Sequence, residues 1–276
     1  MPDKFVDLHI HSFYSDGTMS PKEILEEAIK NNVGVMAITD HDVLEGSIEL
    51  LTLSKDYDIE CISGVELDAI DNGRNIHILG YGMNMMDEAF RSFVKSNRAL
   101  LDLVNYKLIE KMQVDYDFIT TEDYSEYNYD HRKGGWKALH YLMDKGLTKE
   151  LREGFSFYIK YECDYDIVNF PSVQEVCKNI HNAGGKAILA HPGVTFHEYD
   201  TSELSKLIIQ YLDYGFDGIE CYYPKHSDEL TQACLNICKE RNLLITTGSD
   251  CHGGFGNADI GEMKISHSSV LLGDLI

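Results

Sequence analysis

The sequence has little of several residue types, and each shortage excludes a class of protein. Only 5 prolines occur among 276 residues, and the 22 glycines are dispersed, which argues against collagen-like or low-complexity structure. No stretch approaches the ~20 apolar residues that a transmembrane helix needs, and no apolar signal segment precedes the first expected strand. The seven cysteines are odd in number and form no Cys-x-x-Cys unit, so reduced thiols are expected. Together these shortages predict a globular, cytoplasmic protein with no membrane partner.

Positive charge is also scarce. The chain has 24 Lys and Arg against 46 Asp and Glu, a formal net charge of -22. Such a field repels polyanions, so long nucleic acid is not an expected partner. Clustered carboxylates attract cations, and part of the acidity can serve to hold metal, although a solvated acidic surface accounts for most of it. The composition does not determine the oligomeric state.

Short apolar runs alternate with amphipathic segments, a pattern typical of β/α units with parallel strands. A Ser-Pro-Lys-Glu sequence at 20–23 and a second capping box at Ser172 each predict the start of a helix, and a long helix is expected at 87–113. Strands are expected at 5–10, 34–39, 59–70, 74–80, 185–190, 217–221 and 243–248. The length suits a single α/β barrel or a barrel with an insertion.

The pattern changes at residues 114–169, which are rich in tyrosine and acidic residues and have helical pieces around 136–145. We expect this segment to be an inserted, mainly helical cap. Residues 1–113 and 170–276 would then form one α/β domain.

Metal-capable side chains close nearly every expected strand. They are His9, His11, Asp40, His41, Glu66, His77, His191, Glu220, Asp250 and His252. In β/α barrels the carboxyl ends of the strands converge on one face, and histidines two positions apart on a strand share a side. The sequence therefore predicts a site for more than one cation. Five histidines lack this placement and are expected to be structural or at the surface: His131, His140, His181, His197 and His267.

These residues belong to a series of motifs that runs in order along residues 5–260. The motifs are Asp7-Leu-His-Ile-His-Ser12 with Ser15-Asp16-Gly17, Ala37-Ile-Thr-Asp-His-Asp42, Gly64-Val-Glu66, His77-Ile-Leu-Gly80, Ala190-His-Pro192, Gly218-Ile-Glu220 and Gly248-Ser-Asp-Cys-His-Gly253. The series resembles the PHP (polymerase and histidinol phosphatase) family. That resemblance implies an α/β fold, a distorted seven-stranded β/α barrel similar to a TIM barrel.

The resemblance also implies a trinuclear metal site. It places His9, His11, Glu66 and Asp250 around one ion, Glu66, His77 and His191 around a second, and Asp16, His41 and His252 around a third. Glu66 would bridge two ions. Nitrogen and oxygen donors suit Mn, Zn or Fe, so two to three such divalent ions are the expected cofactors. Cys251 lies among these ligands but is expected to be a packing residue.

Asp16 makes the chain similar to a branch of small nucleoside phosphatases that act on AMP or 3',5'-bisphosphonucleotides and carry a helical insertion. Those relatives show a Gly-Arg-Pro-His segment where this chain has Gly134-Gly-Trp-Lys137. Trp136 and Lys137 are therefore candidates for a stacking face and a phosphate contact, with a core tryptophan as the alternative. Arg98 and Lys225 are further candidates for phosphate contacts, with ordinary solvated charges as the alternative.

The expected activity is metal-dependent hydrolysis of a small phosphomonoester, such as a nucleotide, by metal-activated hydroxide. Asp40 is expected to orient an imidazole, and Glu220 and His226 to lie beside the leaving group, with His226 as the candidate general acid. The alternatives are a histidinol-phosphate-type phosphatase and an exonuclease acting on short oligonucleotides. From another class, the chain could be an inactive, metal-stabilised regulatory or binding module.

Overall fold

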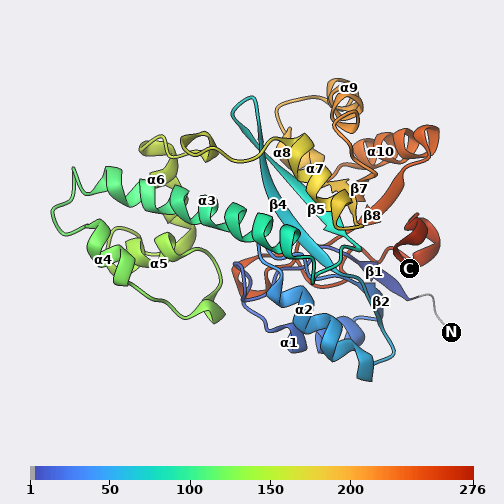
Figure 1. Ribbon diagram of the computed structural model, residues 1–276, viewed down its shortest axis with the longest axis horizontal. Helices are drawn as coiled ribbons and strands as arrows, with labels where there is room; N and C mark the ends of the chain where they lie inside the picture. Colours follow the sequence, from blue (N-terminus) through green and yellow to red (C-terminus); the bar gives the residue numbers. More distant parts are fainter. Residues whose placement is uncertain (1–3) are drawn as a thin grey trace.

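A computed structural model describes residues 4–276 and shows a mixed α/β protein (Figure 1). One sheet contains, in order, β1 (Phe5–Asp7), β2 (Val33–Met36) and β3 (Glu60–Cys61), which pair in parallel. The other contains, in order, β4 (Gly64–Asp71), β5 (Arg74–Tyr81), β6 (Lys186–Leu189), β7 (Gly218–Tyr222) and β8 (Leu244–Thr247). β5 is antiparallel to both of its neighbours, and the other pairs are parallel. The predicted α/β class is confirmed.

Backbone hydrogen bonds join the edges of the two sheets. The Leu8 amide donates to the Thr247 carbonyl at 3.0 Å, and the Asp42 amide donates to the Glu66 carbonyl at 2.9 Å. In the described part of the chain, the two sheets are joined by isolated bridges, Ile10 with Cys251 and His41 with Glu66, rather than by continuous ladders. The described strands therefore form sheets of three and five strands, whereas a single seven-stranded barrel was expected. The difference arises because the contacts between the sheet edges are short and because β3 adds a strand to the smaller sheet.

The helices begin where the capping signals predict. Ser20 caps α1 (Pro21–Lys30) and Ser172 caps α7 (Val173–Asn182), each in a reciprocal pair with a glutamate three residues later. The other helices outside the 114–169 segment are α2 (Glu45–Leu53), α3 (Glu88–Met112), α8 (Pro192–Thr195), α9 (Thr201–Leu212) and α10 (Asp228–Arg241). Within residues 4–276, no helix is long and apolar enough to cross a membrane.

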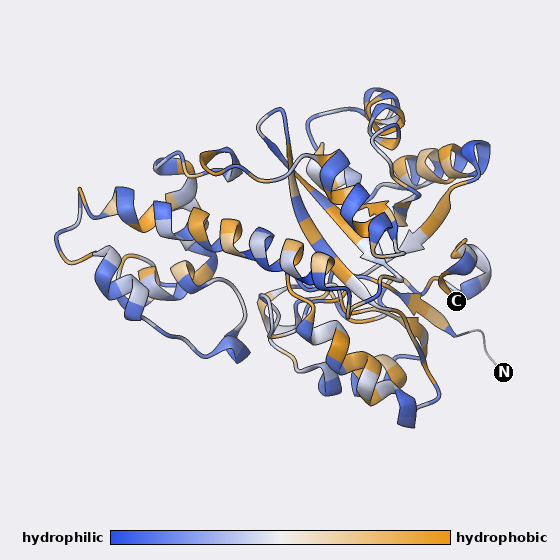
Figure 2. Ribbon diagram, viewed as in Figure 1, coloured by the Kyte–Doolittle hydropathy of each residue, from blue (hydrophilic) through white to orange (hydrophobic). Residues whose placement is uncertain are grey.

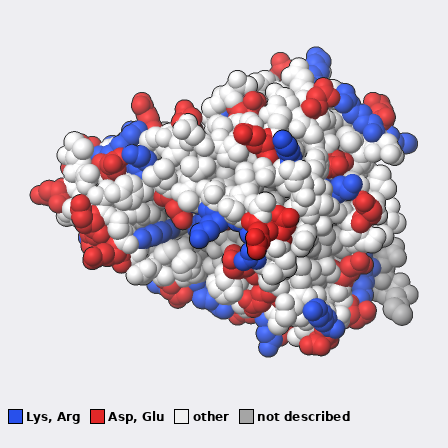
Figure 3. Space-filling model, in the orientation of Figure 1, with Lys and Arg blue, Asp and Glu red and all other residues white. Residues whose placement is uncertain are grey.

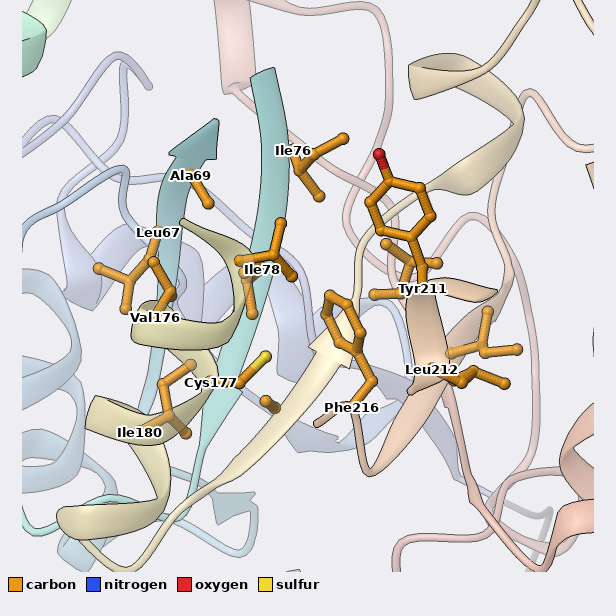
Figure 4. Close-up of a cluster of buried hydrophobic side chains, with 14 of the residues drawn as sticks. Leu67, Ala69, Ile76, Ile78, Val176, Cys177, Ile180, Tyr211, Leu212 and Phe216 are labelled. Carbon is orange, nitrogen blue, oxygen red and sulfur yellow. The ribbon is translucent and has the colours of Figure 1, made fainter. Parts of the chain in front are cut away.

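The largest apolar core lies between the five-stranded sheet and the helices that follow it. Leu67 and Ile78 of the β4–β5 hairpin face Cys177 and Ile180 of α7, and Phe216 packs beside them (Figure 4). The strands and the inward faces of the helices are accordingly hydrophobic (Figure 2). Full burial of such a side chain contributes roughly 1.5–3 kcal/mol, so this core holds the strand ends in fixed positions.

The 114–169 segment projects to one side of the molecule (Figure 1). It contains α4 (Thr121–Glu126), α5 (Lys137–Asp144) and α6 (Phe155–Lys160), and no strand is assigned in it. The 25 residues of α3, a rod of roughly 37 Å, extend from the sheet to this segment. There Leu108 and Ile109 pack with Tyr141 and Leu142 of α5 in a second apolar cluster. The mainly helical character predicted for the segment is confirmed.

Candidate metal centre

All nine residues predicted as metal ligands converge on one region. They form four overlapping groups, and within each group the ligand atoms lie within 4.8 Å of one another. The groups are His11, Asp16, His41 and His252; His9, His11 and Asp250; His9, Glu66 and His191; and His41, Glu66 and His77. The five histidines expected to be structural are absent from every group.

Strand ends bring these side chains together. His9 and His11 follow β1, His41 follows β2, and Glu66 and His77 lie on the two strands of the β4–β5 hairpin, where Glu66 pairs with Leu79 and His77 with Asp68. His191 after β6 and Asp250 after β8 have positive φ angles of 24° and 56°. Non-glycine residues seldom adopt this conformation, and such strain is often kept where it aims a functional side chain.

Glu66 lies at the centre and is 1% exposed. One carboxylate oxygen is 3.1 Å from His9 Nε2 and 3.3 Å from His11 Nε2. The other oxygen is 2.8 Å from His77 Nδ1 and 3.0 Å from His191 Nε2. The first oxygen is also 3.4 Å from His41 Nδ1. Each oxygen thus faces a different set of imidazoles, which is the geometry expected of a bridging carboxylate.

The donor set fits bound cations. His9 Nε2 and His11 Nε2 face each other at 3.1 Å, although two neutral ring nitrogens can make a hydrogen bond only if one of them carries the proton. His11 Nδ1 is buried without a hydrogen-bond partner among the described residues, 3.7 Å from Asp16 Oδ1. A cation among these nitrogens and the Glu66 carboxylate would satisfy their lone pairs, and the nitrogen and oxygen donors match first-row divalent metals.

The electrostatics keep the central carboxylates ionised. Burial would raise the pKa of Glu66, but the imidazoles of His9, His77 and His41 hold that pKa well below its usual range. Burial likewise opposes the ionisation of Asp250, whose pKa His9 and His11 keep well below normal. Burial lowers the pKa of His41 to about 4, so this ring is neutral at pH 7. Although burial opposes it, the neighbouring carboxylates raise the pKa of His11 to about 10 and the pKa values of His9 and His77 well above normal. Ionised carboxylates and neutral imidazoles are the forms that bind metal, so a cation bound here would displace the protons of these rings.

A second layer of carboxylates holds the imidazoles. The fully buried Glu220 lies with one oxygen 2.9 Å from His9 Nδ1, and its other oxygen accepts the His191 amide at 2.9 Å. Glu220 therefore lies behind His9, whereas a place beside the leaving group was expected. Asp68 lies 3.2 Å from His77 Nε2 and was not predicted. Its signal was present, because Asp68 is two positions after Glu66 on β4 and opposite His77 across the hairpin.

Asp40 was expected to orient an imidazole, but its hydrogen bonds go to another part of the site. It accepts hydrogen bonds from the Ser12 amide at 2.7 Å, the Ser12 hydroxyl at 2.6 Å and the Ser15 hydroxyl at 2.7 Å. These bonds hold the loop that carries Asp16. Asp40 thus positions one of the candidate ligands through the backbone.

His226 has both ring nitrogens occupied by backbone groups. Its Nε2 accepts the Gly193 amide at 3.1 Å, and its Nδ1 lies 3.1 Å from the Cys221 carbonyl. Burial lowers its pKa, which fits a neutral ring with the proton on Nδ1. Neither nitrogen is free to protonate a leaving group, so the predicted general-acid role is not supported. The ring ties the loop after His191 to the loop after β7.

Two further positioning residues escaped the sequence analysis. The Tyr223 hydroxyl donates to Asp250 Oδ2 at 2.7 Å. Asp7 accepts the amides of Ser249 at 2.9 Å and Gly261 at 2.7 Å, and burial raises the pKa of Asp7 to about 6. Asp7 was visible as part of its motif, whereas nothing in the sequence distinguished Tyr223 from the other aromatic residues.

Trp136 lies at the mouth of this site. Its ring centroid is 5.6 Å from that of His41, and the Arg98 guanidinium lies over the indole at 5.3 Å. Two cavities meet at Trp136, of about 760 Å³ and about 510 Å³, and we call them the large and the small cavity. Arg98 and Lys137 line the small cavity. Lys225 lies apart from them and lines a cavity of about 240 Å³ beside Asp250 and His252.

Two glycines connect the 114–169 segment to the metal-capable residues. Gly134 and Gly135 have φ angles of 67° and 71°, and the Gly135 amide donates to the Asp16 carbonyl at 2.7 Å. A Cβ on Gly135 would lie 2.9 Å from the Phe255 ring. The close approach therefore requires glycine, which explains part of the departure from the Gly-Arg-Pro-His pattern.

Comparisons with known proteins agree with this geometry. A family model described as PHP domain matches residues 7–240. The chain is 28% identical over 266 residues to a 5'-3' exoribonuclease of Haemophilus influenzae, covering 94% of each protein. It is 28% identical over 267 residues to a 3',5'-nucleoside bisphosphate phosphatase of Chromobacterium violaceum, covering 94% of this chain and 91% of that protein. A solved structure from Bifidobacterium adolescentis, assigned as a metal-dependent phosphoesterase, superposes with a TM-score of 0.79 at 25% identity, covering 97% of this chain and 94% of that one.

Proposed function

The chain belongs to the PHP domain family, and on this premise we propose that it is a metal-dependent phosphoesterase that hydrolyses a small phosphomonoester. The proposed substrate class is nucleotides such as AMP or a 3',5'-bisphosphonucleotide, the latter supported by the Chromobacterium violaceum relative. The observation that carries the proposal is the convergence of five histidines on the two oxygens of Glu66. Such a buried cluster of nitrogen and oxygen donors suits phosphoester hydrolysis.

We propose two to three divalent ions, Mn, Zn or Fe, as cofactors. Their ligand sets would be His9, His11, Glu66 and Asp250; Glu66, His77 and His191; and Asp16, His41 and His252. The groups of ligand atoms support the first and third sets. The second set is supported by the single Glu66 oxygen that lies close to both His77 and His191. When bound, such ions neutralise phosphate oxygens and lower the pKa of water, so that hydroxide is available near pH 7.

The protein's own residues would hold these ligands in place. Glu220 and Asp68 fix the rings of His9 and His77 by their second nitrogens. Loss of such a partner typically lowers metal affinity or activity 10–100-fold. Asp40 fixes the Asp16 loop and His226 the loop after His191, so these two residues act by positioning.

The substrate would enter beneath the 114–169 segment, which we propose as a cap inserted into a domain of residues 1–113 and 170–276. Trp136, Arg98 and Lys137 would contact substrate at the small cavity, and Lys225 at the cavity beside Asp250 and His252. We also propose that the two sheets function as one distorted seven-stranded barrel with β3 as an appendage, supported by the hydrogen bonds between their edges. The seven free cysteines support the cytoplasm as the compartment.

A second candidate function is the removal of nucleotides from short oligoribonucleotides. The similarity to the Haemophilus influenzae exoribonuclease favours it. The expectation that long nucleic acid is excluded as a partner therefore stays a prediction.

The test is phosphate or nucleotide release, with added Mn²⁺, from AMP, 3',5'-bisphosphoadenosine, short oligoribonucleotides and histidinol phosphate. We expect a nucleotide to be hydrolysed and a chelator to stop the reaction. Asp250→Ala should abolish turnover while circular dichroism shows an intact fold, and His267→Ala, outside every ligand group, should behave as wild type. Full activity in the Asp250 variant would contradict the assignment. No release from any substrate, with well under one metal per chain, would favour the binding module.

A further inference from the structure

The large cavity lies between α3 and α6, beyond the residues assigned to the metal centre. Its apolar wall includes Leu101 and Val104 of α3 and Phe155, Tyr158 and Ile159 of α6. The volume of about 760 Å³ falls in the range of roughly 300–1,000 Å³ typical of small-molecule sites. Nothing in the proposed hydrolysis uses this space.

Trp136 connects the cavity to the metal centre. The indole lines the large cavity and also lies with its ring centroid 5.6 Å from that of His41. A ligand stacked on this indole would therefore have its other end close to the candidate metal ligands. A nucleotide has this form, with a ring at one end and a phosphate at the other.

The indole borders the large cavity where Arg98 does not line it. Arg98, whose guanidinium lies over the ring at 5.3 Å, lines the small cavity but not the large one. The lining of the large cavity contains no lysine or arginine. An aromatic ligand can therefore stack on Trp136 from the large cavity without displacing Arg98.

The polar groups around the large cavity select the kind of ring. Glu162, Asp164 and Asp166 are the acidic residues of its lining, and ionised carboxylates only accept hydrogen bonds. Asn105 is already engaged, because its amide donates to the Leu101 carbonyl at 2.9 Å and its oxygen accepts the Tyr158 hydroxyl. Such a lining repels a phosphate and favours a ring that carries N–H donors.

We infer that the large cavity binds the base of the substrate, an uncharged heteroaromatic ring with an exocyclic amino group, stacked on Trp136. This inference rests on the proposed function and specifies the leaving-group side of the same substrate. A second phosphate, where the substrate has one, binds instead in the small cavity with Arg98 and Lys137.

The first test compares Phe155→Ala with a matched variant, Phe118→Ala. Both phenylalanines belong to the 114–169 segment and are partly exposed, at 40% and 48%, but only Phe155 lines the large cavity. We expect Phe155→Ala to reduce the preference in kcat/KM for AMP over ribose 5-phosphate by roughly tenfold, because the base loses an apolar contact of its pocket. Phe118→Ala should keep the wild-type preference. Equal preferences in all three proteins would overturn the inference.

A second test uses the fluorescence of Trp136, the single tryptophan of the chain. AMP should change the emission of the wild-type protein, and purine riboside 5'-phosphate, which lacks only the amino group, should bind more weakly. Ribose 5-phosphate at the same concentration should leave the emission nearly unchanged. Identical responses to AMP and ribose 5-phosphate would contradict the inference.

The two proposals can fail separately. Hydrolysis of ribose 5-phosphate and AMP with equal kcat/KM would leave the phosphoesterase in place and remove the base site. A change of Trp136 emission by AMP alone, in a protein that hydrolyses no phosphoester, would leave the base site in place and remove the phosphoesterase.

Discussion

Several buried side chains at this site act on a neighbour rather than on a substrate. Glu220 behind His9, Asp68 behind His77 and Tyr223 beside Asp250 each make a polar contact with a candidate ligand. Such contacts fix the ring tautomer and the direction of the ligand atom. Their removal is expected to weaken metal binding while the ligands themselves remain.

At the residue scale the sequence predicted the ligands better than their partners. Eight of the nine ligands were visible as metal-capable residues on or after the expected strands, and the ninth, Asp16, came from the family resemblance. Glu220 lies at a strand end and His226 in the loop that follows. Glu220 nevertheless contacts the His9 ring, and His226 accepts the Gly193 amide, so neither has the role predicted for it beside the leaving group. That direction depends on residues distant in sequence, which strand periodicity does not report.

The neutral state of His226 predicts a pH dependence of stability. Its pKa in the folded protein lies below the ordinary value of 6.5 because the ring is buried, so just below pH 6.5 the unfolded chain binds the proton more readily. Stability that depends on this ring is present above that pH and is lost as the pH falls through the window. The difference in unfolding free energy between wild type and His226→Gln should therefore shrink from pH 7.5 to pH 5.5. Urea titrations of the metal-free proteins measure it, and a constant difference would contradict the neutral ring.

At the scale of elements, the helix starts were predictable and one strand boundary was not. The capping boxes at Ser20 and Ser172 form as expected, because they depend on residues three apart. The run at 59–70 was expected as one strand, but it divides into β3 and β4. At the break, the Ser63 hydroxyl donates to the Met83 carbonyl and the Gly64 amide donates to the Ser47 hydroxyl. Bonds from such distant segments cannot be read from the run itself.

The contact of Gly135 with the Asp16 loop can be tested against a matched glycine. Gly135 and Gly146 have similar φ angles of 71° and 75°, so alanine should cost roughly 1–2 kcal/mol of backbone strain at either position. A Cβ at 146 meets nothing within 4 Å, whereas one at 135 meets Phe255 at 2.9 Å. Gly135→Ala should therefore destabilise the protein by about 1–3 kcal/mol more than Gly146→Ala. Of the two variants, only Gly135→Ala should reduce turnover. Denaturant unfolding with a phosphate-release assay checks both, and equal losses would refute the contact.

For the molecule as a whole, charge is distributed unevenly. Figure 3 shows acidic side chains gathered at the outer end of the 114–169 segment, while the remaining charges on this face are interspersed. The net charge of -22 produces a field that attracts divalent cations and repels phosphate esters before either reaches the site.

That field predicts a strong effect of salt on metal binding. Raising the ionic strength from about 0.01 M to about 1 M shortens the Debye length from ~30 Å to ~3 Å, so the contribution of distant carboxylates disappears. The apparent Kd for Mn²⁺, followed by Trp136 fluorescence, should rise severalfold, while kcat at saturating Mn²⁺ changes little because the buried ligands are screened less. An unchanged Kd would show that the surface charge plays no part in metal capture.

The hydrogen bond from the Gly135 amide to the Asp16 carbonyl links two binding events. If an ion held by Asp16 stiffens its loop, the same bond steadies Trp136 one residue beyond Gly135, and the free energy that couples the two must act in both directions. A nucleotide that orders the indole should then increase the affinity for that ion by the same factor by which the ion increases the affinity for the nucleotide.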